Sequence, residues 1–294
     1  MPHPDRAPIE IAAHRGTGED FPQLGMLQSH RPSVPPENTL PAFEWGWARG
    51  TTCELDVYLT ADGEVIVIHD DGTKRTCNAD LDVASSSLAE LRALDAGIVK
   101  GETWRGLKLP LLREVLGVMP DGKRLYVELK QGPGLVDPVL AVVDAAGKGP
   151  DQIVFISFSI DAITAIKRKR PEFTCYWIIV FEEVAPRVWR CGYDKTGPDG
   201  LKFVTTWQQP VDYAALVAMA RNEDVRLDAL DTGFVMPDDF PRAMRELGMP
   251  WGVWNIDDAD LVVRLANAGA IQLTSNCTDD VRDVVQRYTR RHVT

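Results

Sequence analysis

The chain has 294 residues, of which 45% are hydrophobic and 26% are charged, and its formal net charge at pH 7 is −11. This balance is typical of a folded globular protein, and a chain of this length can bury a large core. The negative charge argues against a nucleic-acid-binding surface, because phosphate backbones require a basic face. A small phosphorylated substrate is still compatible with it, since a local cation can override the global field.

Cysteine usage and hydropathy indicate the cellular compartment in which the protein is expected. The N-terminal residues contain no apolar segment typical of a signal peptide, and no apolar run approaches the length of a membrane span. The cysteines are odd in number, scattered and without CxxC spacing, which favours reduced thiols. They are Cys53, Cys77, Cys175, Cys191 and Cys277. We therefore expect a cytoplasmic protein without stable membrane insertion; the sequence leaves its oligomeric state open.

The first predicted strand is a short apolar run, residues 9–13, which ends in the tripeptide His-Arg-Gly at 14–16. A polar segment that contains proline and glycine, residues 17–35, follows it. This segment is long for a strand-to-helix connection, and such loops are usually lids, binding loops or disordered. A helix is then predicted up to about residue 49, with Asn38 or Thr39 as its cap.

The stretch from 53 to 71 has the pattern of two strands joined by a tight turn, because apolar side chains alternate on both sides of an Ala-Asp-Gly sequence. Glu54 and Asp56 are two residues apart, so both side chains leave the same face of the first strand. His69 and Asp70 end the second strand. Two carboxylates on one face with an imidazole nearby can form a divalent cation site beside a proton-transfer group.

The rest of the chain alternates between strand and helix patterns. A connection at 70–108 contains one helix, and residues 181–210 are predicted to be irregular, with a hairpin at 203–207. The remaining predicted strands are residues 124–130, 152–157, 173–180, 226–232, 250–256 and 270–275. The helices predicted after residue 80 are 88–94, 111–119, 135–146, 160–169, 213–222, 238–247, 257–268 and 278–290.

This alternation predicts the α/β class and a (β/α)₈ TIM barrel that forms one domain over residues 1–294. The barrel carries an insertion after its second strand and an elongated first βα loop. A doubly wound sheet is the alternative fold. It is disfavoured because no glycine-rich phosphate-binding sequence follows the first strand.

In a barrel of this kind the catalytic groups lie where the strands end. Glu54, Asp56 and Glu128 are hard oxygen ligands there, suited to Mg²⁺ or Ca²⁺. Placed close together they would repel one another, so a cation is the natural compensation. The alternative is that these carboxylates form ion pairs with Arg15 and Lys130.

The other strand-end residues suit an anionic substrate. Arg15 and Lys130 can hold a phosphate, the arginine in bidentate fashion. His14 and His69 can serve as general base and general acid, although an isolated histidine is more often a structural one. Trp254, and less directly Trp207, can form an apolar wall, although core packing is the usual role of a tryptophan.

Six motifs at strand and helix ends together carry a resemblance to a known family. In order they are HRG at 14–16, PENTLPAF at 36–43, ELDV at 54–57, TADG at 60–63, HD at 69–70 and VELK at 127–130. A later sequence, WNID at 254–257, is similar to a tryptophan motif of the same family. The chain resembles the glycerophosphodiester phosphodiesterases.

The resemblance implies a metal-dependent hydrolase that converts glycerophosphodiesters to sn-glycerol 3-phosphate and an alcohol. It implies that a glycerol hydroxyl attacks phosphorus and that water opens the resulting cyclic phosphate. The implied roles are as follows: His14 and His69 as acid and base; Glu54, Asp56 and Glu128 as ligands of one Ca²⁺ or Mg²⁺; Arg15, Lys130 and Trp254 in substrate binding; Glu37, Asn38 and Asp70 in support.

Two features depart from the family pattern and bear on the substrate. Segment 17–35 is far longer than the usual connection between the first two motifs, and Ser275-Asn276 replaces the usual Thr-Asp pair after the last strand. Two alternatives therefore stay open. One is a phosphodiesterase that cleaves lysophospholipids in the manner of a phospholipase D, with an apolar entrance that includes Trp189; the other is a barrel that binds phosphodiesters without turnover.

Overall fold

The computed structural model describes residues 9–16, 33–50, 52–196, 203–222 and 225–291. Most of the predicted long first loop, residues 17–32, lies outside the described residues. No helix among the described residues is long and apolar enough to span a membrane.

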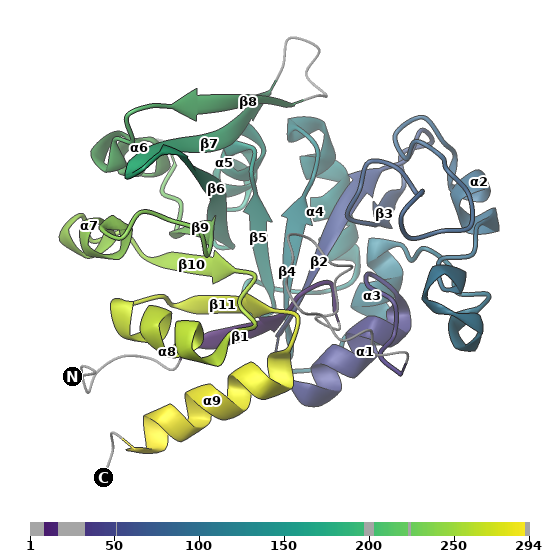
Figure 1. Cartoon of the computed structure of the whole chain (residues 1–294). Helices are drawn as coiled ribbons and strands as arrows, with labels where there is room; N and C mark the ends of the chain where they lie inside the picture. The colour runs from purple at the N-terminus through teal and green to yellow at the C-terminus, as the bar shows by residue number, and fades with distance from the viewer. Residues whose placement is uncertain (1–8, 17–32, 51, 197–202, 223–224, 292–294) are drawn as a thin grey trace.

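Eight parallel strands form a closed barrel, which confirms the predicted fold (Figure 1). The barrel closes because β5 pairs with β6, and its last strand, β11, pairs in parallel with β1. Around the barrel the strands are β1 (Glu10–Ala13), β2 (Thr52–Leu59), β4 (Arg124–Leu129), β5 (Ile153–Ser157), β6 (Thr174–Ala185), β9 (Ala229–Gly233), β10 (Trp251–Trp254) and β11 (Gln272–Ser275).

Helices surround the barrel and bury its outer surface (Figure 1). Apolar side chains from strands and helices form one large core between the two layers, and a smaller cluster fills the barrel interior. The helices are α1 (Leu40–Arg49), α3 (Leu112–Val118), α4 (Val136–Ala145), α5 (Ile160–Lys169), α6 (Tyr213–Ala220), α7 (Phe240–Glu246), α8 (Ala259–Ala268) and α9 (Thr278–Arg291), with a short η3 (Pro133–Leu135) before α4.

The predicted insertion after the second strand is present. It begins with β3 (Val65–Val67), which pairs antiparallel with β2, and continues through α2 (Leu88–Ala93), η1 (Ile98–Lys100) and η2 (Glu102–Trp104). The helix α2 begins with a capping box between Ser87 and Glu90. The insertion has its own small core, built around Ile66, Ile68 and Leu91. It can therefore hold the residues that follow β3 in fixed positions.

The prediction that residues 181–210 are irregular is wrong. The strand β6 continues past the barrel rim, and β7 (Val188–Thr196) and β8 (Phe203–Gln208) extend it as an antiparallel ribbon (Figure 1). A register shift between Glu183 and Ala185 and the glycine at 192 interrupt the alternation that would have revealed the strands. The ribbon stands at the carboxyl end of the barrel strands.

Candidate active site

Three buried carboxylates come together at the carboxyl ends of two neighbouring strands. Glu54 and Asp56 lie on β2, and Glu128 lies on β4 directly opposite Asp56 in the parallel register. One oxygen from each of the three carboxylates lies within 4.8 Å of the others. The structure thus brings together the three residues that the sequence predicted as a cation site.

The electrostatics of this cluster favour a divalent cation. Burial, and then the charges of Asp56 and Glu128, raise the pKa of Glu54 well above its ordinary value. Oε2 of Glu54 accepts a hydrogen bond from the backbone N–H of Arg15 at 2.8 Å. Its buried Oε1 has no hydrogen-bond partner within the part of the chain that the structure describes. A hard cation bound by these oxygens would satisfy the orphaned atom and offset the repulsion.

The two predicted cations pair with the same cluster. Nζ of Lys130 donates to Glu128 at 2.8 Å and lies 3.3 Å from Asp56 Oδ1. Nη1 of Arg15 donates to Glu37 at 2.9 Å, and its Nε lies 3.6 Å from Asp56 Oδ2. Burial alone would raise the pKa of Asp56, but positive neighbours, with Lys130 the strongest, hold it well below its ordinary value. The ion pairs and the three-carboxylate cluster therefore coexist.

The two histidines have different hydrogen-bond partners. Nδ1 of His14 lies 2.8 Å from Oδ1 of Asn276, whereas Nδ1 of His69 lies 2.6 Å from Oδ1 of Asp70. Burial, and then the charge of Arg15, lower the pKa of His14 to about 3, so its imidazole is neutral at physiological pH. A neutral imidazole can accept a proton.

The predicted supporting residues form a second set of contacts around the cluster. Nδ2 of Asn38 donates to Asp56 Oδ2 at 2.9 Å. Asn38 has a φ of 54° and Arg15 a φ of 50°, so both backbones adopt the left-handed conformation at the site. Thr39 occupies the N-cap of α1, as one of the two predicted positions, but its side chain makes no capping hydrogen bond; its hydroxyl donates to the Pro36 carbonyl instead.

Sequence reasoning missed two charged residues of the site. Arg75, in the loop after β3, donates to both Glu37 and Asp70. Asp231, on β9, is buried, and burial followed by the charge of Glu128 raises its pKa to about 8. Arg75 belongs to no motif, but Asp231 stands in an apolar strand pattern, where an acidic residue is a signal that could have been used.

The predicted apolar wall is only partly assembled. Trp254 ends β10, and its ring packs edge-on against Phe158 at a centroid distance of 6.0 Å. Trp207 lies on β8 and is 40% exposed, with the Arg190 guanidinium 4.0 Å above its ring. Trp189 is partly buried and packs against the large core, and its part in the entrance stays a prediction.

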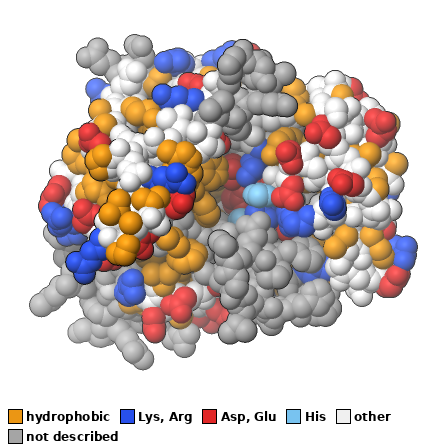
Figure 2. Space-filling model, turned by 45° about the horizontal axis from the view of Figure 1, so that its top comes forward, with side chains coloured by type: hydrophobic (Ala, Val, Ile, Leu, Met, Phe, Trp, Pro, Cys, Tyr) orange, Lys and Arg blue, Asp and Glu red, His pale blue; other side chains and the backbone are white. Residues whose placement is uncertain are grey.

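Figure 2 shows a hollow with histidine side chains in it and with acidic and basic side chains around them. Hydrophobic side chains gather along one side of this hollow.

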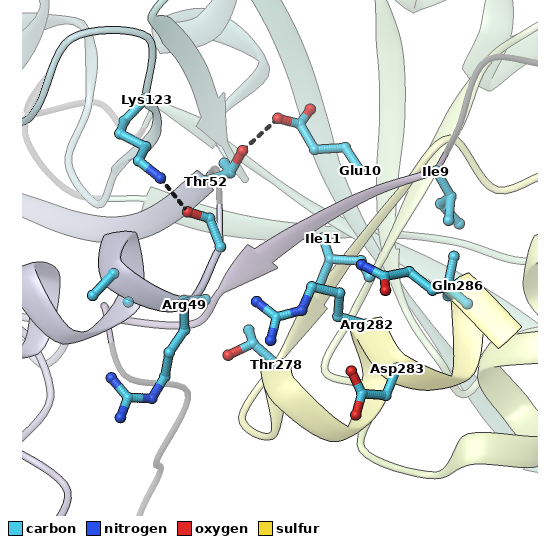
Figure 3. A pocket seen from close by; sticks show the side chains of 15 residues that line it. Ile9, Glu10, Ile11, Arg49, Thr52, Lys123, Thr278, Arg282, Asp283 and Gln286 are labelled. Atoms are coloured by element: carbon cyan, nitrogen blue, oxygen red, sulfur yellow. Dashed lines mark hydrogen bonds between the residues drawn. The ribbon is translucent and has the colours of Figure 1, made fainter.

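A separate cavity of about 690 Å³ lies where β1, the end of α1 and α9 meet (Figure 3). Its polar groups include Lys123, which donates to the Gly50 carbonyl, and Thr52, which donates to Glu10. None of the predicted site residues lines this second cavity.

Comparison with known proteins identifies relatives of this chain. The model of the glycerophosphoryl diester phosphodiesterase family matches residues 14–280. A glycerophosphodiester phosphodiesterase of Caldanaerobacter subterraneus subsp. tengcongensis is 31% identical over 167 residues, which are 55% of this chain and 63% of that protein. The Bacillus subtilis enzyme of the same name is 29% identical over 199 residues, 62% of each chain. The matched regions thus span less than two thirds of these curated relatives.

Solved structures share the fold. An Oleispira antarctica phosphodiesterase, determined with the product sn-glycerol-3-phosphate, has a TM-score of 0.72 and 22% identity, over 95% of this chain and 97% of that one. A glycerophosphodiester phosphodiesterase of Agrobacterium tumefaciens has a TM-score of 0.65 and 21% identity, over 93% and 98%. At these identities the likeness supports the barrel architecture.

Proposed function

The chain belongs to the glycerophosphoryl diester phosphodiesterase family, and we propose that it hydrolyses glycerophosphodiesters to sn-glycerol 3-phosphate and an alcohol. The observation that carries this proposal is the convergence of three buried carboxylates and two histidines at one end of the barrel. The Oleispira antarctica relative, determined with sn-glycerol-3-phosphate, supports the same product class.

Glu54, Asp56 and Glu128 would hold one divalent cation, Ca²⁺ or Mg²⁺. When bound, such a cation neutralises charge on phosphoryl oxygens and lowers the pKa of a coordinated hydroxyl group. Arg15 and Lys130 add positive charge beside the cluster and would bind the remaining phosphate oxygens. Trp254 would contact the organic part of the substrate.

The two histidines would move the protons. In the first step the neighbouring glycerol hydroxyl forms a bond to phosphorus and loses its proton to one histidine. The bond between phosphorus and the alcohol breaks, and the alcohol oxygen takes a proton from the other histidine. This gives a cyclic phosphate. In the second step water opens it, and each proton returns in the opposite direction, so that both histidines regain their starting states.

The test is the release of glycerol 3-phosphate from glycerophosphocholine and glycerophosphoethanolamine with Ca²⁺, Mg²⁺, Mn²⁺ or EDTA. We expect metal-dependent turnover that is lost in Glu54→Gln and His14→Ala but kept in the control Glu114→Gln, whose carboxylate on α3 pairs with Arg92 on α2. A wild-type protein that binds glycerol 3-phosphate but turns over no diester with any metal would contradict the proposal and favour the binding-only alternative.

The ribbon favours a second candidate, cleavage of lysophospholipids. On β6, Tyr176 and Ile178 belong to the cluster inside the barrel. Alternate residues of a strand share a face, so Val180 continues this inner face beyond the rim. Val180 pairs with Gly192, which pairs with Trp207. The exposed Trp207 therefore stands on a surface continuous with the barrel interior, where an acyl chain could lie.

Comparing lysophosphatidylcholine with glycerophosphocholine tests this second candidate. We expect Trp207→Ala to lower kcat/KM for the acylated substrate while leaving that for glycerophosphocholine unchanged. Trp45→Ala is the matched control, because Arg49 stacks on Trp45 as Arg190 stacks on Trp207. Equal effects of Trp207→Ala on both substrates would exclude an acyl-binding role for the ribbon.

The cysteines bear on where the reaction would take place. None of the five cysteines forms a disulfide, and four of them are buried. This supports a reducing compartment, and we propose the cytoplasm.

A further inference from the structure

A hydrogen-bonded chain leads from the end of β10 to His14. Asp257 accepts from the Asn276 backbone N–H at 2.8 Å and from the Ser275 hydroxyl at 2.9 Å through its Oδ1. Its Oδ2 accepts from the Asn276 side-chain Nδ2 at 3.1 Å. Oδ1 of the same Asn276 amide faces Nδ1 of His14 at 2.8 Å. The chain is possible because β10, β11 and β1 are neighbours in the barrel, so their carboxyl ends meet.

The chemistry of these groups permits one arrangement of protons. An ionised carboxylate only accepts hydrogen bonds, so the amide nitrogen of Asn276 must face Asp257. The amide oxygen then faces His14 and also only accepts. Nδ1 of His14 must therefore carry the ring proton. In a neutral imidazole this leaves the lone pair on Nε2.

The other histidine is held by a different kind of group. Nδ1 of His69 faces the carboxylate of Asp70, and Arg75 donates to both oxygens of that carboxylate. A carboxylate stabilises a charged imidazolium ring, whereas a neutral amide does so much less. The two rings therefore face different acceptors, a neutral amide at His14 and a carboxylate at His69.

We propose that Asp257 and Asn276 are positioning residues that hold His14 in the tautomer with its proton on Nδ1. In the reaction proposed above, on which this inference rests, His14 then accepts the proton of the attacking glycerol hydroxyl at Nε2. His69 supplies the proton to the departing alcohol. The carboxylate of Asp257 fixes the orientation of the Asn276 amide.

Asp257→Asn tests the chain with a minimal change of shape. Both oxygens of Asp257 accept hydrogen bonds from Asn276, one from the backbone N–H and one from the side-chain Nδ2. In the variant, an amide nitrogen replaces one of these oxygens and would face one of these two donors, with which it cannot form a hydrogen bond. We expect the Asn276 amide to rotate, so that its nitrogen faces His14 and the ring proton moves to Nε2. The kcat should fall by ~10²–10⁴, the usual contribution of a general base, with little change in KM. The ¹⁵N chemical shifts of the His14 ring should report the exchanged tautomer.

The double variant Asp257→Asn with Asn276→Asp tests whether exchanging the two side chains rescues the single variant. It exchanges amide and carboxylate, so an acceptor again faces His14 Nδ1, and we expect both the original tautomer and most of the kcat to return. Ser275→Ala is the control, because it removes one hydrogen bond to Asp257 without touching the Asn276 amide. A wild-type ring protonated on Nε2, an Asp257→Asn variant with unchanged tautomer and kcat, or a double variant without recovery would each overturn the proposal.

The ring spectra separate this inference from the proposed function. They are recorded on the full chain with and without Mg²⁺, and they need no turnover. If the wild type hydrolyses no diester, the proposed function fails, yet the spectra still decide whether Asp257 and Asn276 set the tautomer. If turnover is present and the tautomer does not respond to Asp257→Asn, only this inference fails.

Discussion

Arg75 donates to both carboxylate oxygens of Glu37, at 2.7 and 2.8 Å, although the two residues are 38 positions apart. The same guanidinium donates to both oxygens of Asp70, at 2.7 and 3.0 Å. Glu37 in turn pairs with Arg15, and Asp70 pairs with His69. Arg75 therefore joins the segment before α1 to the loop that carries the second histidine.

Arg75→Met should impair both stability and catalysis. It leaves the buried Glu37 with one cation and removes the support of Asp70. We expect the free energy of unfolding to fall by about 2 kcal/mol, less than for a fully buried pair because the Arg75 side chain is 24% exposed. The kcat should fall roughly 10-fold or more, because Asp70 no longer holds the His69 ring in place.

Arg92→Met is the control for this prediction, because Arg92 on α2 makes a similar bidentate pair with Glu114 on α3. It should cost up to ~1 kcal/mol of stability and leave kcat unchanged. Arg75→Lys should recover little, since an ammonium group cannot bridge two carboxylates in the same bidentate fashion. A wild-type kcat in Arg75→Met would show that the network is only structural.

Glu54→Gln should stabilise the metal-free protein while abolishing its response to metal. The raised pKa of Glu54 means that its charged form is disfavoured in the fold, so a neutral side chain of the same shape relieves the repulsion. In EDTA we expect a gain of about 1–3 kcal/mol, or roughly 2–5 °C in Tm. The wild type should gain Tm on addition of Mg²⁺ or Ca²⁺, and the variant should not. A variant that melts below the wild type in EDTA would contradict this.

The barrel could be predicted from the sequence because most of its strands are short apolar runs followed by a helix pattern. The carboxylate cluster could be predicted for a related reason. Glu54 and Asp56 share a face by strand periodicity, and Glu128 ends the neighbouring strand. Local patterning therefore determined both the elements and the strand ends at which the charged groups stand.

What could not be predicted depends on contacts between distant segments. Arg75 reaches Glu37 only because the insertion folds back on the barrel, and Asp257 reaches His14 only through Asn276 on the next strand. The ribbon was missed except at 203–207, where the predicted hairpin is the single strand β8, because Gly192 breaks the alternation of β7. Strand β9 begins at Ala229 rather than at the predicted 226, since residues 225–227 lack ladder pairing.

Asp231 should make stability depend on pH. Burial, and then Glu128, raise its pKa to about 8, whereas an unfolded aspartate has a pKa of about 3.9. The folded state therefore holds a proton that the unfolded state releases. This contribution to stability is complete below pH ~4 and is lost as pH rises towards 8, by up to ~1.4 kcal/mol per pH unit.

Asp231→Asn isolates this effect, because it mimics the protonated carboxyl group. In EDTA we expect the variant to match the wild type near pH 4 and to exceed its stability increasingly up to pH 8, as measured by urea unfolding. Asp228→Asn serves as the control, since Asp228 is close in sequence but 40% exposed and paired with Lys167. A pH-independent difference between wild type and Asp231→Asn would mean that Asp231 is ionised in the fold.

Gly46→Ala should damage the site although Gly46, on α1, is not one of the site residues. A Cβ at this position would lie 1.9 Å from the Gly16 carbonyl oxygen and 2.6 Å from the Cys53 sulfur, so the backbone after Arg15 would have to move. Alanine in a helix normally adds up to ~1 kcal/mol of stability relative to glycine. Here we expect a net loss of about 1–3 kcal/mol from overpacking, and a lower kcat because Gly16 directly follows His14 and Arg15.

Gly50→Ala is the matched control at the end of the same helix. Its φ of −140° suits any residue, and its nearest new contact would be 3.8 Å away. We expect it to leave kcat unchanged and to alter stability by less than about 1 kcal/mol. Thermal unfolding and glycerol 3-phosphate release, measured on both variants, compare their stability and activity. If Gly46→Ala is as stable and active as Gly50→Ala, the close approach of α1 to Gly16 does not determine where His14 and Arg15 stand.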